Sequence, residues 1–313
     1  MPANLLAVLA ARAEAQAHPG GAPCTTCPAP ATLADRPDAT VVRHAAAVAK
    51  AHAPGTGQAE LTARLAAAAA LPDIFLVPLG PAPAVLHGRL VTCWPYGVPV
   101  DPDDPDAAPW ESAAVLLARL HRASVPVALP PMRGPAKAAR AIARLRAGAF
   151  GHPAARSVLR AWSALPAWVR GEAPAPGRAA LCHGDLHLGQ LVRHPAPDGP
   201  WRLIDVDDLG VGVPAWDLAR PAAWYACGLL PPQEWARFLG AYRAAGGPAV
   251  PADGDPWPAL DLPARALTVQ GAARALVRAG SEGRGVDEVE QALVDSCERM
   301  AEIPPPPGGP GAK

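Results

Sequence analysis

Apolar and polar positions alternate with a period of two in much of the first hundred residues, and then change to a helical spacing. The alternation predicts a hairpin whose turn lies at Asp35–Asp38, followed by further strands. The predicted strands cover 31–33, 40–43, 46–52, 74–77 and 89–94. A short amphipathic helix is predicted at the N-terminus and another over about 57–70. This part therefore predicts an antiparallel sheet with one intervening helix.

From Trp110 onward, apolar residues recur at three- and four-residue intervals, which predicts buried helices. The first of them contains 113–121, and the others cover about 135–147, 153–170, 232–245, 261–280 and 286–302. Two short strands interrupt this pattern at 179–182 and 201–204, and a loop is expected over 210–214. Residues 304–313 are rich in proline and glycine, so we expect them to be disordered. The fold class is α+β, with a boundary expected between 97 and 98.

Charge and cysteine content exclude several function classes. Lys plus Arg and Asp plus Glu number 28 each, so there is no global electrostatic case for binding nucleic acid or an anionic membrane. No apolar run reaches the roughly 18 residues that a bilayer crossing needs, and the N-terminus lacks the basic flank of a secretory signal. The 6 cysteines are spread along the chain rather than concentrated in one small domain, which favours a reducing cytoplasm.

Cys24 and Cys27 have the spacing of a zinc knuckle, but no second cysteine pair follows them. His44 and His52 are the residues that could complete four ligands. The alternative, which the pattern favours, is an ordinary loop that leads into the first strand.

The most informative segment is His183-Gly184-Asp185-Leu186-His187-Leu188-Gly189-Gln190, followed by Leu203-Ile204-Asp205. An aspartate follows His-Gly, a side-chain amide comes five residues later, and an apolar strand ends in a second aspartate. Protein kinases have the same order of groups: the first aspartate accepts the proton of the attacking hydroxyl, and the amide and second aspartate hold magnesium. The alternative is that Asp185 and Asp205 only cap turns, which would not require the amide between them.

With glycine between the histidine and the aspartate, this segment resembles the aminoglycoside phosphotransferase and choline-kinase-like family. Leu120-His121 and Asp217-Leu218-Ala219 resemble further family patterns. The resemblance implies a bilobal protein-kinase-like fold, with a small β-rich N-terminal lobe (1–97) that binds the nucleotide and a larger, mainly helical C-terminal lobe (98–303). It implies Asp185 as the catalytic base and Gln190 and Asp205 as magnesium ligands. His183, His187 and Asp217 are expected to have structural roles.

Val48-Ala49-Lys50 resembles the kinase strand whose lysine binds the nucleotide phosphates and pairs with a glutamate on the next helix. Glu60 is the only acidic residue of that predicted helix. The resemblance therefore implies a Lys50–Glu60 pair at the nucleotide. The alternatives are a solvated lysine at a strand end, and a first-turn glutamate that only favours the helix dipole.

The predicted hairpin turn departs from the kinase pattern. Kinases cover the phosphates with a glycine-rich loop, whereas Ala34–Asp38 contains no glycine and two acidic residues, whose carboxylates would repel phosphate. Farther along, Pro95–Pro99 fits a hinge where adenine would dock on backbone groups.

The sequence thus predicts a cytoplasmic small-molecule kinase that uses Mg²⁺ and ATP or GTP. Its predicted partners are the nucleotide and a hydroxyl acceptor (an aminoglycoside, a sugar, an amino sugar or a similar alcohol), with no nucleic acid, membrane or protein partner. The alternative is a catalytically inactive kinase-fold module that binds a nucleotide or a partner, favoured by the acidic turn and by glutamine at position 190.

Overall fold

The computed structural model describes residues 2–20, 26–124, 128–148, 152–177 and 179–302. The chain divides into two compact units. The first lies within 1–116, 123–130 and 188–210, and the second within 117–122, 131–187 and 211–313. The single boundary predicted between 97 and 98 differs from this division, because the chain returns to the first unit after the predicted catalytic aspartate. Cys24 and the predicted disordered tail, 304–313, lie outside the described residues.

The first unit contains a five-stranded antiparallel sheet with the order β1-β2-β3-β5-β4. Its strands are β1 (Ala31–Arg36), β2 (Ala39–His44), β3 (Ala47–Ala51), β4 (Ala84–Leu86) and β5 (Arg89–Pro95). Burial alternates along β2 and β3, as their apolar pattern predicts. The antiparallel sheet is therefore confirmed.

The strand expected at 74–77 is wrong. Phe75 forms only an isolated parallel bridge to Leu203, and β4 takes the edge position of the sheet instead. The segment 74–76 is apolar and buried, and burial alone does not distinguish a strand from a packed loop.

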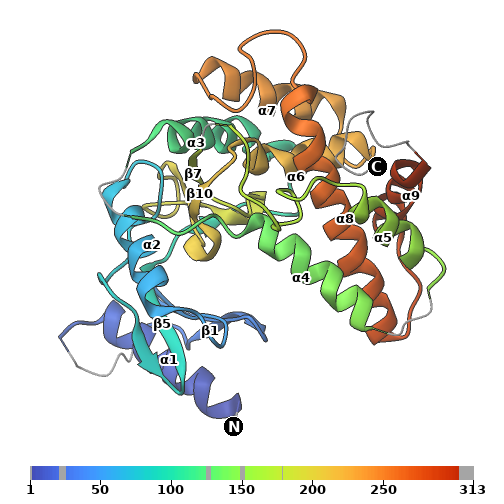
Figure 1. Ribbon diagram of the computed structural model, residues 1–313. Coiled ribbons are helices and arrows are strands. Elements are labelled where there is room, and N and C mark those ends of the chain that lie inside the picture. The colour runs from blue at the N-terminus through green and yellow to red at the C-terminus, as the bar shows by residue number, and fades with distance from the viewer. Residues whose placement is uncertain (1, 21–25, 125–127, 149–151, 178, 303–313) are drawn as a thin grey trace. The chain divides into compact units, whose positions relative to one another are not determined.

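Helix α1 (Pro2–Ala17) packs on the sheet, beside β2, β3 and β5 (Figure 1). Leu9 and Ala13 of the helix are buried against Val42, Ala49 and Val91 of these strands. Helix α2 (Gln58–Ala70) follows β3, as predicted, and contacts the 3₁₀ turn η3 (Val206–Asp208).

A second, smaller sheet in the first unit carries the segment around Asp205. It consists of β6 (Val98–Pro99), β8 (Leu191–Arg193) and β9 (Trp201–Leu203), all antiparallel. Asp205 lies two residues after β9 and directly before η3. A short 3₁₀ turn, η1 (Pro105–Ala107), precedes α3 (Trp110–Arg122), whose residues from Leu117 onward belong to the second unit.

The second unit is mainly helical, as predicted. Its remaining helices are α4 (Gly134–Ala147), α5 (Ala155–Ser163), α6 (Ala215–Ala226), α7 (Pro232–Ala244), α8 (Trp257–Glu282) and α9 (Glu288–Glu302). The long helix α8 contacts α4, α5, α6 and α9, and small residues such as Ala266, Ala272 and Ala273 let it approach its neighbours closely (Figure 1).

Three boundaries differ from the predictions. The helix expected over 153–170 ends at Ser163, because the residue before Pro166 is disfavoured in helical conformation. The loop expected over 210–214 contains β10 (Gly210–Gly212), which pairs with β7 (Ala180–Cys182). Helix α8 begins at Trp257, earlier than predicted, and accommodates Pro263 in its interior.

No helix in these described ranges combines the length and the apolar content that a membrane crossing requires.

Candidate active site

A buried carboxylate binds the backbone of the loop that follows β7. Asp217, on the first turn of α6, accepts the backbone N–H of His183 at 2.6 Å and that of Gly184 at 2.7 Å. Gly184 has a φ of 84°, a conformation that glycine adopts without a Cβ penalty. Asp217 therefore binds the two backbone N–H groups that immediately precede Asp185. It does not cap the N–H groups at the start of its own helix.

Asp217 is in turn positioned by a buried polar chain. His121 Nε2 lies 3.1 Å from Asp217 Oδ2, and His121 Nδ1 lies 2.7 Å from the hydroxyl of Tyr242. That hydroxyl accepts the N–H of Ala249 at 3.0 Å. Because the carboxylate only accepts, the His121 proton belongs on Nε2, and Tyr242 then donates to Nδ1. The Leu120-His121 pattern thus corresponds to a structural support of the loop.

Asp185 lies between two cations. Lys137 Nζ, from α4, donates to Asp185 Oδ2 at 2.6 Å, and Arg220, from α6, donates to Asp185 Oδ1. The Asp185 side chain is 18% exposed. Burial alone would raise the pKa of its carboxyl group, but Lys137 and Arg220 outweigh burial and hold that pKa below its usual value. Asp185 is therefore ionised at neutral pH.

Local packing explains how the two cations reach Asp185. Gly134 begins α4 against Trp216, and a Cβ at Gly134 would lie 2.1 Å from the Trp216 indole nitrogen. Only glycine permits this approach, which sets the position of Lys137 one turn later. Arg220 follows Asp217 by three residues on α6 and also donates to the carbonyl of Leu186 at 3.0 Å. The two residues therefore lie on neighbouring positions of one helix face.

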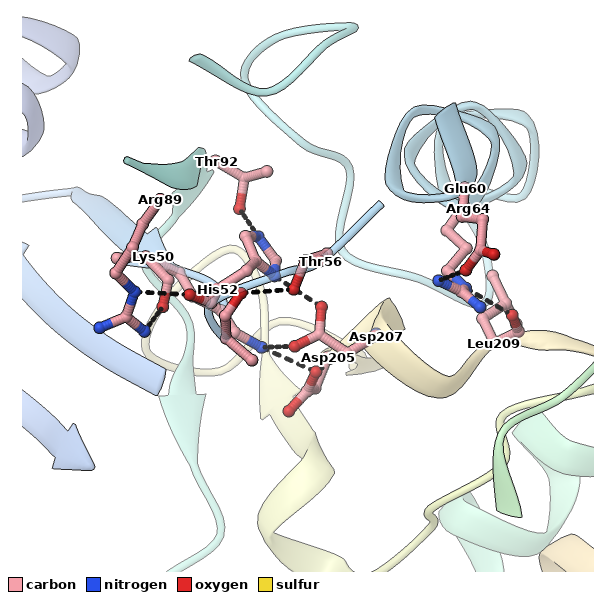
Figure 2. Close-up of polar contacts among 12 residues, drawn as sticks. Lys50, His52, Thr56, Glu60, Arg64, Arg89, Thr92, Asp205, Asp207 and Leu209 are labelled. Carbon is pink, nitrogen blue, oxygen red and sulfur yellow. Dashed lines mark hydrogen bonds and ion pairs between the residues drawn. The ribbon is translucent and has the colours of Figure 1, made fainter. Parts of the chain in front are cut away.

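In the first unit, Lys50 lies between two carboxylates (Figure 2). Its Nζ is 2.7 Å from Asp205 Oδ1 and 3.0 Å from Asp207 Oδ2. Burial alone would lower the pKa of Lys50, but the two carboxylates outweigh burial and raise it above its usual value. The same contacts, together with His52, hold the pKa of Asp207 below its usual value against the effect of burial. Lys50 therefore pairs with Asp205 and Asp207, two partners that the sequence analysis did not assign to it.

Asp205 adopts a left-handed backbone conformation, with a φ of 65°. Non-glycine residues seldom adopt it, and such strain is concentrated at functional sites. Asp tolerates the conformation better than most residues because its short side chain can bond locally, and Asp205 Oδ1 accepts the N–H of Asp207 at 3.4 Å. The conformation turns the chain abruptly from β9 into η3 and brings Asp207 beside the same lysine.

His52 orients Asp207 (Figure 2). The ring is buried, with Nδ1 at 2.6 Å from Asp207 Oδ1 and Nε2 at 2.8 Å from Thr92 Oγ1. Trp94 Nε1 also donates to Thr92 Oγ1, at 2.8 Å. A neutral ring with its proton on Nδ1 satisfies all three contacts, because the Thr92 hydroxyl then donates to Nε2. His52 therefore has a role other than the zinc ligand that the Cys24–Cys27 spacing suggested.

The expected ion pair between Lys50 and Glu60 is not formed in the described structure. Glu60 is 53% exposed and pairs with Arg64 at 3.3 Å, one turn along α2. Arg64 is buried and donates through Nε to the carbonyl of Leu209 at 2.9 Å (Figure 2). Lys50 already has Asp205 and Asp207 as carboxylate partners. Helix α2 is linked to the segment after Asp205 through Arg64 instead.

Gln190 is buried, and its side chain points toward Asp205 with the nitrogen end of the amide. Its Nε2 lies 3.5 Å from Asp205 Oδ2, whereas the magnesium-ligand role implied by the resemblance would use the carbonyl oxygen of the amide. A carboxylate oxygen only accepts hydrogen bonds, so the N–H end of the amide faces Asp205 Oδ2. Rotating the amide by half a turn would present Oε1 instead, as a metal ligand requires.

The donor set around Asp205 fits a magnesium ion. Two carboxylates face one ammonium group, so the cluster has an excess of negative charge when His52 is neutral. Carboxylate and amide oxygens are the ligands that Mg²⁺ takes in nucleotide sites. Asp205, Asp207 and Gln190 are the residues that would hold the ion, and of these the family resemblance implied Asp205 and Gln190.

The hairpin turn is shorter than the predicted Asp35–Asp38, because β1 continues to Arg36 and only Pro37 and Asp38 lie in the turn. Asp35 accepts the hydroxyl of Thr40 at 3.3 Å, and both Asp35 and Asp38 are exposed. At the predicted hinge, the N–H of Tyr96 bonds to the carbonyl of Ala46 at 2.8 Å, and the Arg43 guanidinium lies 3.3 Å from the Tyr96 ring centre. A docked adenine would therefore use backbone groups other than the Tyr96 N–H.

The sequence matches the phosphotransferase enzyme family over residues 31–260, more than half of the chain. The matched region contains both aspartate clusters and the supporting chain from His121 to Tyr242. This protein belongs to the phosphotransferase enzyme family.

Solved structures confirm the fold. A choline/ethanolamine kinase family protein from Mesorhizobium loti aligns with a TM-score of 0.55 and 18% identity, covering 93% of this chain and 95% of that one. A macrolide 2′-phosphotransferase from Brachybacterium faecium gives 0.52 and 19%, covering 95% and 99%. An aminoglycoside phosphotransferase in complex with AMP-PNP and hygromycin B gives 0.59 and 13%, covering 92% and 98%. No curated protein sequence matches. The predicted protein-kinase-like fold and family are thus confirmed.

Proposed function

We propose that this protein transfers the γ-phosphoryl group of ATP or GTP to a hydroxyl group of a small molecule, such as an aminoglycoside, a sugar, an amino sugar or a similar alcohol. The observation that carries the proposal is the pair of charged clusters. The cluster around Asp185 would accept the proton of the hydroxyl group, and the cluster around Lys50 would bind the nucleotide phosphates and Mg²⁺. The similar structures include a choline/ethanolamine kinase family protein, a macrolide 2′-phosphotransferase and an aminoglycoside phosphotransferase, and this likeness supports a small-molecule acceptor.

In the proposed reaction, Asp185 accepts the proton of the acceptor hydroxyl. Its carboxylate is ionised at neutral pH, and both of its oxygens are oriented by cations before the acceptor arrives. The acceptor hydroxyl must replace or share one of these contacts, and Lys137 has the more flexible side chain of the two partners. Lys137 would then lie where it can compensate negative charge on the transferred phosphoryl group.

Lys50 binds the α- and β-phosphates in this proposal, and Asp205 with Gln190 and Asp207 holds Mg²⁺. When bound, the ion would neutralise phosphate charge during the transfer. The arrival of a nucleotide gives Lys50 phosphate oxygens in place of its carboxylate partners. His52 keeps Asp207 in orientation when Lys50 moves, because its bond to Asp207 does not involve the lysine.

The alternative is an inactive kinase-fold protein that binds a nucleotide or another partner. The exposed carboxylates of Asp35 and Asp38 favour it, since they would oppose phosphates covered by the hairpin. The two functions differ in turnover: the inactive protein binds ligand without transferring phosphate.

The test is a transfer assay with radiolabelled ATP or GTP, Mg²⁺ and a panel of aminoglycosides, macrolides, sugars, amino sugars and choline-like alcohols. We expect phosphorylation of at least one class of acceptor, abolished by Asp185→Asn and retained by Asp253→Asn. Asp253 is an exposed loop residue of the same unit, so its substitution is a matched control. Nucleotide binding without transfer to any acceptor, and without magnesium-dependent hydrolysis, would support the inactive alternative.

A further inference from the structure

A buried histidine in the first unit has no polar partner among the described residues. His44, the last residue of β2, is 4% exposed, and neither its Nδ1 nor its Nε2 forms a hydrogen bond there. Buried polar groups are ordinarily satisfied, and an exception calls for a ligand or ion that completes them. An imidazole ring with both nitrogens unsatisfied is therefore the first indication of a metal site.

Two further metal-binding side chains lie beside His44. His18 follows α1 directly, and its ring centre is 5.4 Å from that of His44, at an interplanar angle of 72°. Cys27 Sγ lies 3.6 Å from His18 Nε2. One ligand atom from each of the three residues lies within 4.8 Å of the others. These residues come from three separate segments of the chain, so the fold brings them together.

The spacing and the donor types fit zinc. Zn–S bonds of about 2.3 Å and Zn–N bonds of about 2.0–2.1 Å in a tetrahedron place sulfur and nitrogen about 3.6 Å apart, which matches the separation between Cys27 and His18. Imidazole and thiolate suit zinc, whereas magnesium and calcium prefer oxygen ligands. This cluster contains no carboxylate, unlike the cluster around Asp205.

We propose that His18, Cys27 and His44 bind a structural zinc ion. The ion would fasten the end of α1 and the segment before β1 to the end of β2. Binding removes the Cys27 thiol proton to solvent as the Zn–S bond forms, and takes both histidines as neutral ligands. The three side chains leave one tetrahedral position for a fourth ligand.

A second group, His121, Cys182 and Asp217, also lies within ligand distance. Its histidine nitrogens bond to Tyr242 and Asp217, and the Asp217 oxygens accept backbone N–H groups. This group is already satisfied and supports the loop before Asp185, so it carries no metal proposal.

The test measures metal in the full chain without an affinity tag, purified with reductant and dialysed against low zinc in the absence of nucleotide. Elemental analysis should find about one zinc per chain. His44→Ala and Cys27→Ser should each lose most of it, whereas His87→Asn should retain it, since His87 is an exposed histidine in the same unit. Asp205→Asn should also retain it, which excludes zinc held at the magnesium cluster.

Cobalt substitution provides a measurement that needs no variant to fold. Co²⁺ should give the visible absorption of a tetrahedral site together with a thiolate-to-cobalt charge-transfer band, and EDTA should lower the melting temperature of the zinc-loaded protein. Full zinc content in both His44→Ala and Cys27→Ser would overturn the proposal. It would equally be overturned by wild-type protein that takes up neither zinc nor cobalt, or that contains a disulfide at Cys27 despite the reductant.

Discussion

The two charged clusters use the same kinds of residue in opposite proportions. In the first unit, Asp205 and Asp207 share Lys50, so two carboxylates face one cation. In the second unit, Lys137 and Arg220 share Asp185, so two cations face one carboxylate. Both clusters are largely shielded from water, so the excess charge of each interacts more strongly with a bound ligand than it would in bulk solvent.

The difference indicates which ligand each cluster suits. Excess negative charge favours a divalent cation, and excess positive charge favours phosphoryl oxygens that develop charge during transfer. Neither cluster alone suffices for the proposed reaction. The predictions below change one residue of a cluster at a time, so that the separate contributions of the two can be measured.

The largest effect is expected at Asp185. Asp185→Asn keeps the size of the side chain but removes the proton acceptor, so kcat should fall by about 10²–10⁴-fold, the usual contribution of a general base. Nucleotide affinity, measured by calorimetry, should remain near wild type. Turnover close to wild type in a folded Asp185→Asn protein would remove Asp185 from the mechanism.

A smaller loss is expected at Lys137. Lys137→Met removes one of the two cations at Asp185 and should lower kcat by about 10²-fold, as removal of one charge-stabilising donor does. Lys137→Arg keeps the charge and should restore part of the activity. Equal activities of the Met and Arg variants would show that the charge at this position is unimportant.

The pH profile sharpens the Lys137 prediction. Lys137 and Arg220 lower the pKa of Asp185, so the carboxylate persists on acidification and kcat/KM should fall only below about pH 4, the ordinary range of an aspartate. In Lys137→Met one source of that lowering is absent, and the acid limb should move to higher pH. If the acid limb of the kcat/KM profile were unchanged in Lys137→Met, Lys137 would have no influence on the pKa of Asp185.

Gln190→Ala should have a moderate effect. Loss of an amide next to Asp205 should lower kcat by roughly 10-fold, at the lower end of what changes around a metal cost, and should weaken ATP binding less. Gln233→Ala, at an exposed position of α7, is the control. A Gln190→Ala enzyme with unchanged kcat would mean that the amide only supports the loop.

Glu60→Ala should have the smallest effect. Because Glu60 pairs with Arg64 and not with Lys50, turnover should stay near wild type, and the free energy of unfolding should fall by less than about 1 kcal/mol. Lys50→Met, by contrast, should impair nucleotide binding. Comparable losses in the two variants would restore the expected Lys50–Glu60 pair in the active state.

Elements with strong local signals could be predicted from the sequence. The period-two pattern of β2 and β3 and the apolar spacing of α2 and α4 locate these elements to within a residue or two. The strand expected at 74–77 and the helix expected to continue to 170 were wrong, because tertiary burial and Pro166 decided those segments. The apolar pattern does not contain the effect of tertiary burial, whereas Pro166 was a local signal in the sequence that could have ended the predicted helix.

The candidate site was predictable where a motif orders its residues along the chain. Asp185, Gln190 and Asp205 were identified in this way, whereas Lys137 and Arg220 reach Asp185 from two separate helices. The lysines of this arginine-rich chain are Lys50, Lys137 and Lys313. Lys50 and Lys137 both contact the clustered carboxylates. The small number of lysines in the sequence could therefore have identified these two as candidate site residues.

The division of roles between the clusters is tested most directly by the magnesium-dependent part of nucleotide stabilisation. Melting temperatures with ATP should be measured with and without Mg²⁺ in the wild type, Asp205→Ala and Asp185→Asn, with Asp73→Ala as an exposed control. We predict that Asp205→Ala loses the magnesium-dependent increase, because the cluster loses its excess negative charge, and that Asp185→Asn and Asp73→Ala keep it. A full magnesium-dependent increase in Asp205→Ala, or its loss in Asp185→Asn, would contradict the account.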